Sequence, residues 1–220
     1  MRKRLEFHPK RFLFTIACFA VVINNLVAEI FPNLKTGDLI FQGEGNTEFS
    51  KAIANSTSSE KDSINFIHVG IIEVVEDSVR IIEASSEAGV RIIDLDDFLK
   101  QSPRHKGKPA VVVKRLDIAF PLEEAIKRAK SHLGEPYDWW YLPENGKMYC
   151  SELVYESYLD SDGNKIFPAK PMNFRNPDGS MPEFWINLFQ QLGRPIPEGL
   201  PGTNPNDLSR HPSLIEIKNY

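Results

Sequence analysis

The chain has 220 residues, of which 26 are Lys or Arg and 30 are Asp or Glu, so its formal net charge is −4 at pH 7. Nucleic-acid binding needs clustered positive charge, and this composition argues against it. The length suits a single domain with a proper hydrophobic core.

The first residues have the pattern of an export signal. Basic residues gather from Arg2 to Arg11, and Phe12 to Ile23 form an apolar run of the length typical of a signal-peptide core. A membrane span needs roughly 20 apolar residues, and Asn24-Asn25 interrupt this run first. We therefore predict no permanent membrane span but a signal peptide over residues 1–28, cleaved after Ala28. The mature protein, secreted or periplasmic, would then carry a formal charge of −8.

Cysteine content limits the covalent chemistry. Cys18 lies inside the apolar run after Thr15-Ile16-Ala17, a poor lipobox, so we do not expect lipidation. Cleavage of the signal would leave Cys150 alone, and no internal disulfide could form. A lone thiol in an exported chain is an inert buried residue, a partner for another chain or a nucleophile.

Residues 38–116 predict an antiparallel sheet. A short strand over Asp38 to Gln42 precedes a short helix over Thr47 to Asn55. Consecutive β-branched runs joined by short turns then favour an antiparallel meander or barrel. These runs predict strands over Phe66–Val75, Val79–Ala84, Val90–Ile93 and Ala110–Leu116.

Helices are predicted in the second half. Pro121 opens a helix whose apolar residues recur at helical spacing to Leu133, and Gly134 stands where a left-handed residue ends it. A second helix should begin near Cys150, and a third is predicted over Glu183 to Leu192.

From Gly193 the chain is rich in Pro, Gly and Asn, which predicts an irregular tail on the surface before a short strand over Leu214 to Lys218. Because strands and helices do not alternate strictly, the sequence favours the α+β class. We expect one domain over residues 29–220, with the Pro-rich tail from about residue 193.

Cys150 stands where a helix is predicted to start. A helix N-terminus lowers the pKa of a thiol and presents free N–H groups to an oxyanion. A free cysteine is also commonly a small buried residue inside a helix. The residue types alone leave both interpretations open.

A thiolate nucleophile usually needs an imidazole beside it, and His68 is the candidate base. It opens the apolar strand His68-Val69-Gly70-Ile71-Ile72, where a polar residue is out of place. Gly70 would let a neighbouring backbone or a substrate approach. Glu83, flanked by apolar residues on the next predicted strand, could hold the second ring N–H. The alternatives are a strand histidine with a satisfied hydrogen bond and an outward-facing glutamate.

A longer pattern resembles a known enzyme family. Residues 129–140 followed by residues 149–154 resemble the helix–loop–cysteine signature of the NlpC/P60 papain-like hydrolases, and residues 37–41, 68–72 and 82–84 resemble that family's strand motifs. In ordinary members the cysteine precedes the histidine strand, whereas here the strands come first. This order resembles the circularly permuted branch, the YiiX/YebB-like cysteine hydrolases, which is related to the lecithin:retinol acyltransferase group.

The resemblance implies a permuted papain-like (NlpC/P60) fold and a set of site residues. It implies that Cys150 is the nucleophile, that His68 is the general base and then acid, and that Glu83 orients the imidazole. Tyr137 matches the family tyrosine that lines the site near the oxyanion; alone, it would read as a buried aromatic at a turn.

Tyr149 and Ser151, on either side of the nucleophile, are further substrate or oxyanion candidates. Two departures from the family pattern leave specificity for cell-wall peptides in doubt. Tyr149 replaces an acidic residue before the cysteine, and Glu152 replaces a glycine two positions after it. The Glu152 carboxylate either points into the site and disfavours acidic substrates, or covers the helix surface.

The sequence therefore predicts an exported cysteine hydrolase, an amidase or peptidase with a Cys-His-Glu triad. It would form a thioacyl-enzyme with cell-wall peptides or small aminoacyl compounds. The alternatives are a lipid deacylase or acyltransferase-like enzyme, and a non-catalytic module that binds lipid or a wall fragment. The expected partner is a small peptide, aminoacyl or lipid-like substrate. No metal or other cofactor is predicted, because the mature chain has one cysteine and no paired-histidine motif.

Overall fold

The computed structural model describes residues 33–59 and 64–217, so the signal peptide predicted over residues 1–28 lies outside the described residues. Residues 34–218 form one compact unit. Within the described ranges, no helix combines the length and the apolar character that crossing a bilayer requires.

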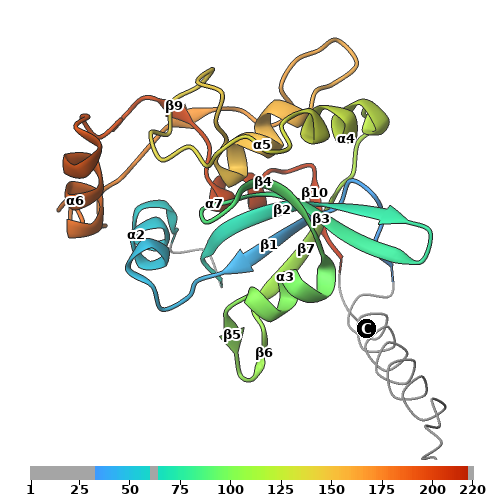
Figure 1. Ribbon diagram of the computed structural model, residues 1–220, viewed down its shortest axis with the longest axis horizontal. Coiled ribbons are helices and arrows are strands. Elements are labelled where there is room, and N and C mark those ends of the chain that lie inside the picture. The colour runs from blue at the N-terminus through green and yellow to red at the C-terminus, as the bar shows by residue number, and fades with distance from the viewer. Residues whose placement is uncertain (1–32, 60–63, 218–220) are drawn as a thin grey trace, which may run out of the picture. The chain divides into compact units, whose positions relative to one another are not determined.

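The unit is built on a six-stranded antiparallel sheet with the order β10-β7-β1-β2-β3-β4 (Figure 1). Strands β1 to β4 are neighbours in chain order, which confirms the meander over this part, and β7 and β10 extend the sheet beyond β1. The bounds are β1 Leu39–Gly43, β2 Phe66–Val75, β3 Ser78–Ser85, β4 Gly89–Asp94, β7 Val111–Leu116 and β10 Leu214–Glu216.

Helices cover both faces of this sheet. Figure 1 shows α4 (Leu122–Ser131) and α5 (Cys150–Ser157) on one face and α3 (Leu95–Gln101) on the other. Fully buried apolar side chains of α5 belong to the same hydrophobic cluster as those of β1, β2 and β3, and burial of such side chains is the main stabilising contribution to the fold. The remaining elements are α2 Glu48–Thr57, β5 Arg104–His105, β6 Lys108–Pro109, β8 Lys170–Pro171, α6 Glu183–Leu192, β9 Pro201–Gly202 and α7 Pro205–Ser209.

The α+β class is confirmed. The elements β2 and α6 have the predicted bounds, and β1, β3, β4 and β7 differ from theirs by one residue at one or both ends. The helix predicted from Pro121 to Leu133 is shorter, because α4 ends at Ser131 and Leu133 is exposed. Gly134, with φ +87°, still takes the left-handed conformation expected of it.

The tail from residue 193 differs from the prediction of an irregular surface coil. It contains β9 and α7, and the α7 residues Pro205, Asn206, Leu208 and Ser209 are buried. The Asn206 side-chain oxygen accepts a hydrogen bond from the Phe66 N–H at 2.7 Å, and its amide donates to Thr57 at 2.8 Å. The tail is thus part of the packed unit, joined to the start of β2 and the end of α2.

Candidate active site

Cys150 is the first residue of α5 and is only 4% exposed. Tyr149 before it is extended, so the chain enters the helix at the cysteine. The backbone of Met148 pairs with that of the segment around Tyr137: the Asp138 N–H donates to Met148, and the Met148 N–H donates to Pro136. This pairing brings Tyr137 and Cys150 together across the loop that separates them.

The Tyr137 segment is itself fixed against the sheet. The N–H of Val90 on β4 donates to the Glu135 carbonyl at 2.8 Å, and the Gly134 N–H donates to the Val90 carbonyl at 2.9 Å. A Cβ on Gly89 would lie 2.2 Å from the Glu135 carbonyl oxygen, and Gly89 has φ +70°. Only glycine permits this approach, so Gly89 sets the distance between β4 and the loop.

His68 lies beside an irregularity in β2. Gln42 of β1 pairs with His68 and Gly43 pairs with Phe66, so Ile67 is an extra residue that forms a β-bulge. Bulges redirect side chains and are common next to active sites. The imidazole also stacks on Phe98 of α3, with ring centroids 6.0 Å apart.

A chain of polar contacts runs from His68 across β3 to β4. The Cys150 side chain is close enough to His68 to raise its pKa, and His68 Nε2 lies 2.6 Å from Glu83 Oε2. The other carboxylate oxygen of Glu83 accepts a hydrogen bond from Arg91 Nε at 2.8 Å. Glu83 and Arg91 are direct cross-strand partners on β3 and β4. The structure therefore brings together the three residues predicted as catalytic and adds Arg91, which sequence reasoning missed.

The charges of this cluster favour an imidazolium. Burial by itself lowers the pKa of His68, but hydrogen bonds with Cys150 and Glu83 and their negative charges outweigh burial and raise the pKa to about 10. Burial acts to raise the pKa of Glu83, and the contacts with His68 and Arg91 overcome it and hold that pKa below its ordinary value. At neutral pH the ring is thus a cation beside an ionised carboxylate.

Tyr149 and Ser151, on either side of Cys150, form hydrogen bonds with the tail of the chain. The Tyr149 hydroxyl accepts a hydrogen bond from the Thr203 N–H, and the Ser151 hydroxyl accepts one from the Thr203 hydroxyl, both at 3.1 Å. Both residues are buried and line the hollow beside Cys150. They connect α5 to the segment between β9 and α7.

Glu152 takes neither of the positions considered from the sequence. It is 5% exposed, it lines neither hollow of the site, and its carboxylate accepts a hydrogen bond from the Tyr149 N–H at 3.2 Å. Such a contact satisfies one of the free N–H groups at a helix start. Burial and the negative charges of Asp138, Glu156 and Glu135 raise its pKa to about 8, against the opposing effect of the Tyr149 hydrogen bond.

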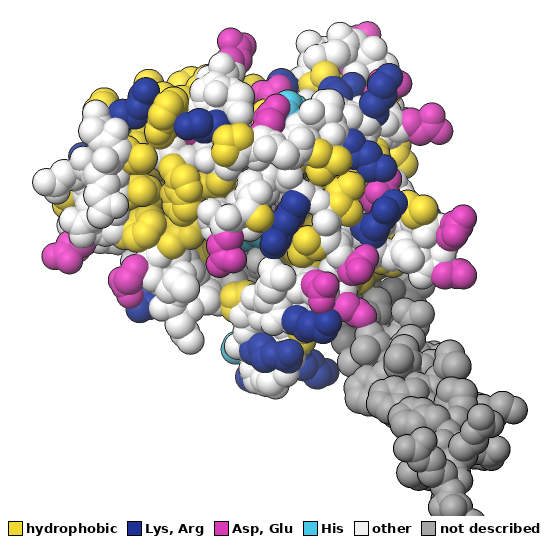
Figure 2. All heavy atoms as spheres, viewed as in Figure 1, with side chains coloured by type: hydrophobic (Ala, Val, Ile, Leu, Met, Phe, Trp, Pro, Cys, Tyr) yellow, Lys and Arg dark blue, Asp and Glu magenta, His cyan; other side chains and the backbone are white. Residues whose placement is uncertain are grey.

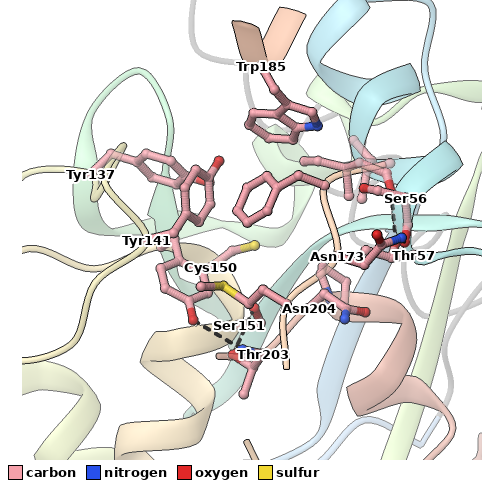
Figure 3. Close-up of a pocket in the computed structure, with 16 residues that line it drawn as sticks. Ser56, Thr57, Tyr137, Tyr141, Cys150, Ser151, Asn173, Trp185, Thr203 and Asn204 are labelled. Carbon is pink, nitrogen blue, oxygen red and sulfur yellow. Dashed lines mark hydrogen bonds between the residues drawn. The ribbon is translucent and has the colours of Figure 1, made fainter. Parts of the chain in front are cut away.

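A small apolar hollow of about 50 Å³ opens beside Cys150. Figure 3 shows Tyr137 and Tyr141 on one side of the cysteine and Trp185 nearby. Trp185 lies 5.7 Å from Tyr141 and 5.1 Å from Phe174 between ring centroids. Tyr141, Phe174, Trp185 and Thr203 line this hollow and were missed from the sequence, because they come from loops and α6 without any motif.

A larger polar groove of about 590 Å³ lies on the histidine side. It is lined by His68 and Glu83 together with residues of the β1–α2 loop, the β3–β4 turn and the segment after α3. Tyr137 and Ile67 line both hollows, so they form the boundary between them. Cys150 lines the first of them and His68 the second.

A sequence model described as "permuted papain-like amidase enzyme, YaeF/YiiX, C92 family" matches residues 33–218. The chain belongs to this family of permuted papain-like amidases, which are cysteine hydrolases. The permuted papain-like assignment made from the sequence is confirmed at this level, although the matching family is C92 rather than NlpC/P60.

Two similar proteins come from Escherichia coli. The uncharacterized protein YiiX of strain K12 is 26% identical over 186 residues, which are 83% of this chain and 85% of that protein. A crystal structure of YiiX from strain O157:H7, described as a metalloprotein of DUF1105, has a TM-score of 0.66 at 26% identity. The match covers 84% of this chain and 97% of that one.

Proposed function

We propose that this protein is an exported amidase in which Cys150 attacks the carbonyl, His68 transfers protons and Glu83 orients the imidazole. The main support is the hydrogen-bonded series His68–Glu83–Arg91, together with the effect of the nearby Cys150 side chain on the pKa of His68. A nucleophile, a base and an orienting group in hydrogen-bonding contact are the arrangement that covalent hydrolysis requires.

The proposed acylation begins with an ion pair between the Cys150 thiolate and the His68 imidazolium. The Cys150 sulfur bonds to the carbonyl carbon of the amide, and the carbonyl π electrons move to oxygen. When the oxyanion collapses, the C–N bond breaks and the amine leaves with the proton of the His68 imidazolium. The enzyme then holds a thioester on Cys150 and a neutral imidazole.

Deacylation requires a neutral His68 ring that acts as a base, and acylation of Cys150 itself converts the imidazolium into that neutral ring. Part of what raises the pKa of His68 is the hydrogen bond and the negative charge of Cys150. A thioester no longer supplies that charge, so the pKa of the imidazole falls toward its ordinary value. The neutral ring takes a proton from water, the water oxygen bonds to the acyl carbon, and the C–S bond breaks to return the thiolate and release a carboxylic acid.

The oxyanion would form at the start of α5. The first N–H groups of a helix have no intrahelical partner, and such donors stabilise a developing oxyanion. Tyr137, which lines the hollow beside Cys150, is the side chain that we place next to that oxygen. Tyr149 and Ser151 instead shape the wall through their hydrogen bonds with Thr203.

Cell-wall peptides and small aminoacyl compounds are the proposed substrates, because export through the predicted signal would place the enzyme where such amides occur. N-terminal sequencing of the exported protein tests this location, and the mature chain should begin at Glu29. The apolar lining beside Cys150 favours a second candidate function, deacylation or transfer of a short lipid-like acyl group.

The residues of this site do not fit a metal centre, although one E. coli relative is described as a metalloprotein. Within residues 33–59 and 64–217, no group of three or more His, Cys, Asp and Glu residues is arranged to hold a metal ion. Both oxygens of Glu83 are engaged by His68 and Arg91. No proposed step passes through a metal.

Alkylation by iodoacetamide and hydrolysis of amide substrates test this proposal together. We expect Cys150 to alkylate at neutral pH faster than a free thiol. Cys150→Ala should abolish hydrolysis of muropeptides and aminoacyl amides, and His68→Asn should reduce it by about 10²–10⁴-fold. His211→Asn is the matched control, since His211 packs against Phe167 away from the site, and it should leave turnover unchanged.

Normal turnover in Cys150→Ala would refute the proposed nucleophile. If Cys150 is unreactive and neither muropeptides nor phospholipids are consumed, a non-catalytic binding module is the better account.

A further inference from the structure

The two hollows at the reacting pair differ in chemistry and contain different members of the pair. The hollow of about 50 Å³ is lined by Cys150 but not by His68, and the groove of about 590 Å³ is lined by His68 but not by Cys150. The two halves of a substrate are therefore received by different surfaces.

The proposed reaction determines which half each surface receives. The acyl carbon bonds to the Cys150 sulfur, so the substituent on that carbon lies on the cysteine side. The leaving amine takes its proton from His68, so the amine and its substituents lie on the imidazole side. With Tyr137 and Ile67 as the boundary, the acyl substituent enters the small hollow and the amine occupies the groove.

The small hollow is suited to an apolar group. Its walls include the aromatic rings of Tyr137, Tyr141 and Trp185 (Figure 3) and that of Phe174. Hydroxyl and amide side chains complete the lining, and no Lys, Arg, Asp or Glu belongs to it. A charged substituent there would lose its hydration without gaining a partner, which is strongly unfavourable. Figure 2 shows hydrophobic side chains gathered in the region of α2 and α6, and these two helices contribute Ile53 and Trp185 to the hollow.

The size of the hollow limits the length of that group. A cavity of about 150 Å³ accommodates benzene, and this one has about one third of that room, near 50 Å³. It therefore suits a few carbon atoms, such as the side chain of alanine or valine, and not a long acyl chain.

The groove on the histidine side has the opposite character. It is lined by hydroxyl and amide side chains and by the charged residues Glu44, Glu83, Glu87, Arg91 and Arg104. It has room for a large polar amine such as the rest of a peptide.

We propose that the enzyme takes amides whose acyl part is short and apolar and whose amine part is larger and polar. The acyl group binds among the rings of Tyr137, Tyr141 and Trp185. This inference rests on the proposed function of Cys150 as the nucleophile, and it narrows the substrates to those with a small apolar acyl residue.

Two substrate series test it. With p-nitrophenyl esters from acetyl to decanoyl, kcat/KM should peak at about three to five carbons and fall by about tenfold or more at ten, because a pocket discriminates strongly per methylene. With aminoacyl amides of one common amine, alanine and valine should exceed lysine and glutamate by about tenfold or more.

Enlarging the pocket supplies an independent measurement. Met172 lines the hollow and is partly buried, so Met172→Ala should shift the optimum toward longer esters. Met181 is also partly buried in the same core but does not line the hollow, so Met181→Ala should leave the chain-length profile unchanged. If Met172→Ala does not fold, the chain-length profile of the wild type alone decides whether the inference holds.

The two proposals fail differently. A preference for long or charged acyl groups, with acylation of Cys150 still detected by mass spectrometry, would overturn the inference and keep the nucleophile. Failure of every ester to acylate Cys150 would overturn the proposed function itself.

Discussion

At the scale of single residues, the charge of Glu83 controls how His68 titrates. The imidazole stays protonated up to a pKa of about 10 because of its contacts with Cys150 and Glu83, which outweigh burial. Glu83→Gln keeps a polar group beside the ring but removes the charge, so the pKa of His68 should fall. In the proposed mechanism the imidazolium protonates the leaving amine, so the alkaline limb of the kcat/KM profile for an amide should move to lower pH. At pH 8, kcat/KM of Glu83→Gln should be lower than that of the wild type by on the order of tenfold or more.

Glu76→Gln is the control for this profile, because Glu76 is an exposed carboxylate in the turn between β2 and β3. An alkaline limb that stays in place in Glu83→Gln would show that Glu83 does not act through the imidazole.

Residues that depart from their local pattern could be found from the sequence, and residues that tertiary packing assembles could not. His68 and Glu83 stand out as polar residues in apolar strands, and the structure places them 2.6 Å apart. Trp185 and Thr203 look like an ordinary helix aromatic and a loop residue. Only the packing of α6 and the tail brings them to Cys150.

The structure gives a different reason for the glycine at position 70 from the one considered in the sequence. From the sequence it could admit a backbone or a substrate. In the structure a Cβ at Gly70 would lie 2.4 Å from a methyl group of Ile81, so the glycine lets β3 pack closely. The same closeness brings Glu83 of β3 within reach of His68 of β2.

At the scale of elements, the buried carboxylate of α5 makes the helix sensitive to pH. Burial and the charges of three neighbouring acids raise the pKa of Glu152 to about 8, above its ordinary 4.5. A group whose pKa is raised on folding stabilises the protein fully below the unfolded pKa, and that stability is lost as the pH rises through the folded pKa. The free energy of unfolding of the wild type should therefore fall relative to that of Glu152→Gln as the pH rises from 4 to 9. The change should be about 1 kcal/mol or more, since one pKa unit corresponds to about 1.4 kcal/mol.

Thermal unfolding at pH 4 and at pH 9 measures this difference, and 1 kcal/mol corresponds to about 2–4 °C in a protein of this size. Glu183→Gln, in the exposed first turn of α6, should show no such pH-dependent difference. Equal effects of Glu152→Gln at both pH values would mean that folding does not raise the pKa of Glu152.

Elements with a strong internal pattern could be predicted with their bounds. The β-branched run of β2 and the amphipathic α6 begin and end at the predicted residues, Phe66–Val75 and Glu183–Leu192. The helices α3 and α7 have seven and five residues, too short for a helical period to be seen. Their positions follow from packing against the sheet.

At the scale of the whole compact unit, the tail holds together elements that are far apart in the sequence. Asn206 is fully buried, and its side chain bonds both to the start of β2 and to Thr57 of α2. His68 lies two residues after Phe66 in β2. Thr203, three residues before Asn206, forms hydrogen bonds with Tyr149 and Ser151 beside Cys150. Both His68 and Cys150 are therefore connected to one short segment of the tail.

Asn206→Ala tests this dependence, because it leaves the buried N–H of Phe66 without its acceptor. An unsatisfied buried donor costs about 1–3 kcal/mol, so the unfolding temperature should drop by several degrees. We also expect slower alkylation of Cys150 by iodoacetamide at temperatures where the variant is folded, because the start of β2 moves and weakens the contact between His68 and Cys150. Asn187→Ala, at an exposed position on α6, should change neither quantity. Loss of stability with an unchanged alkylation rate would show that the tail supports the fold but does not position the reacting pair.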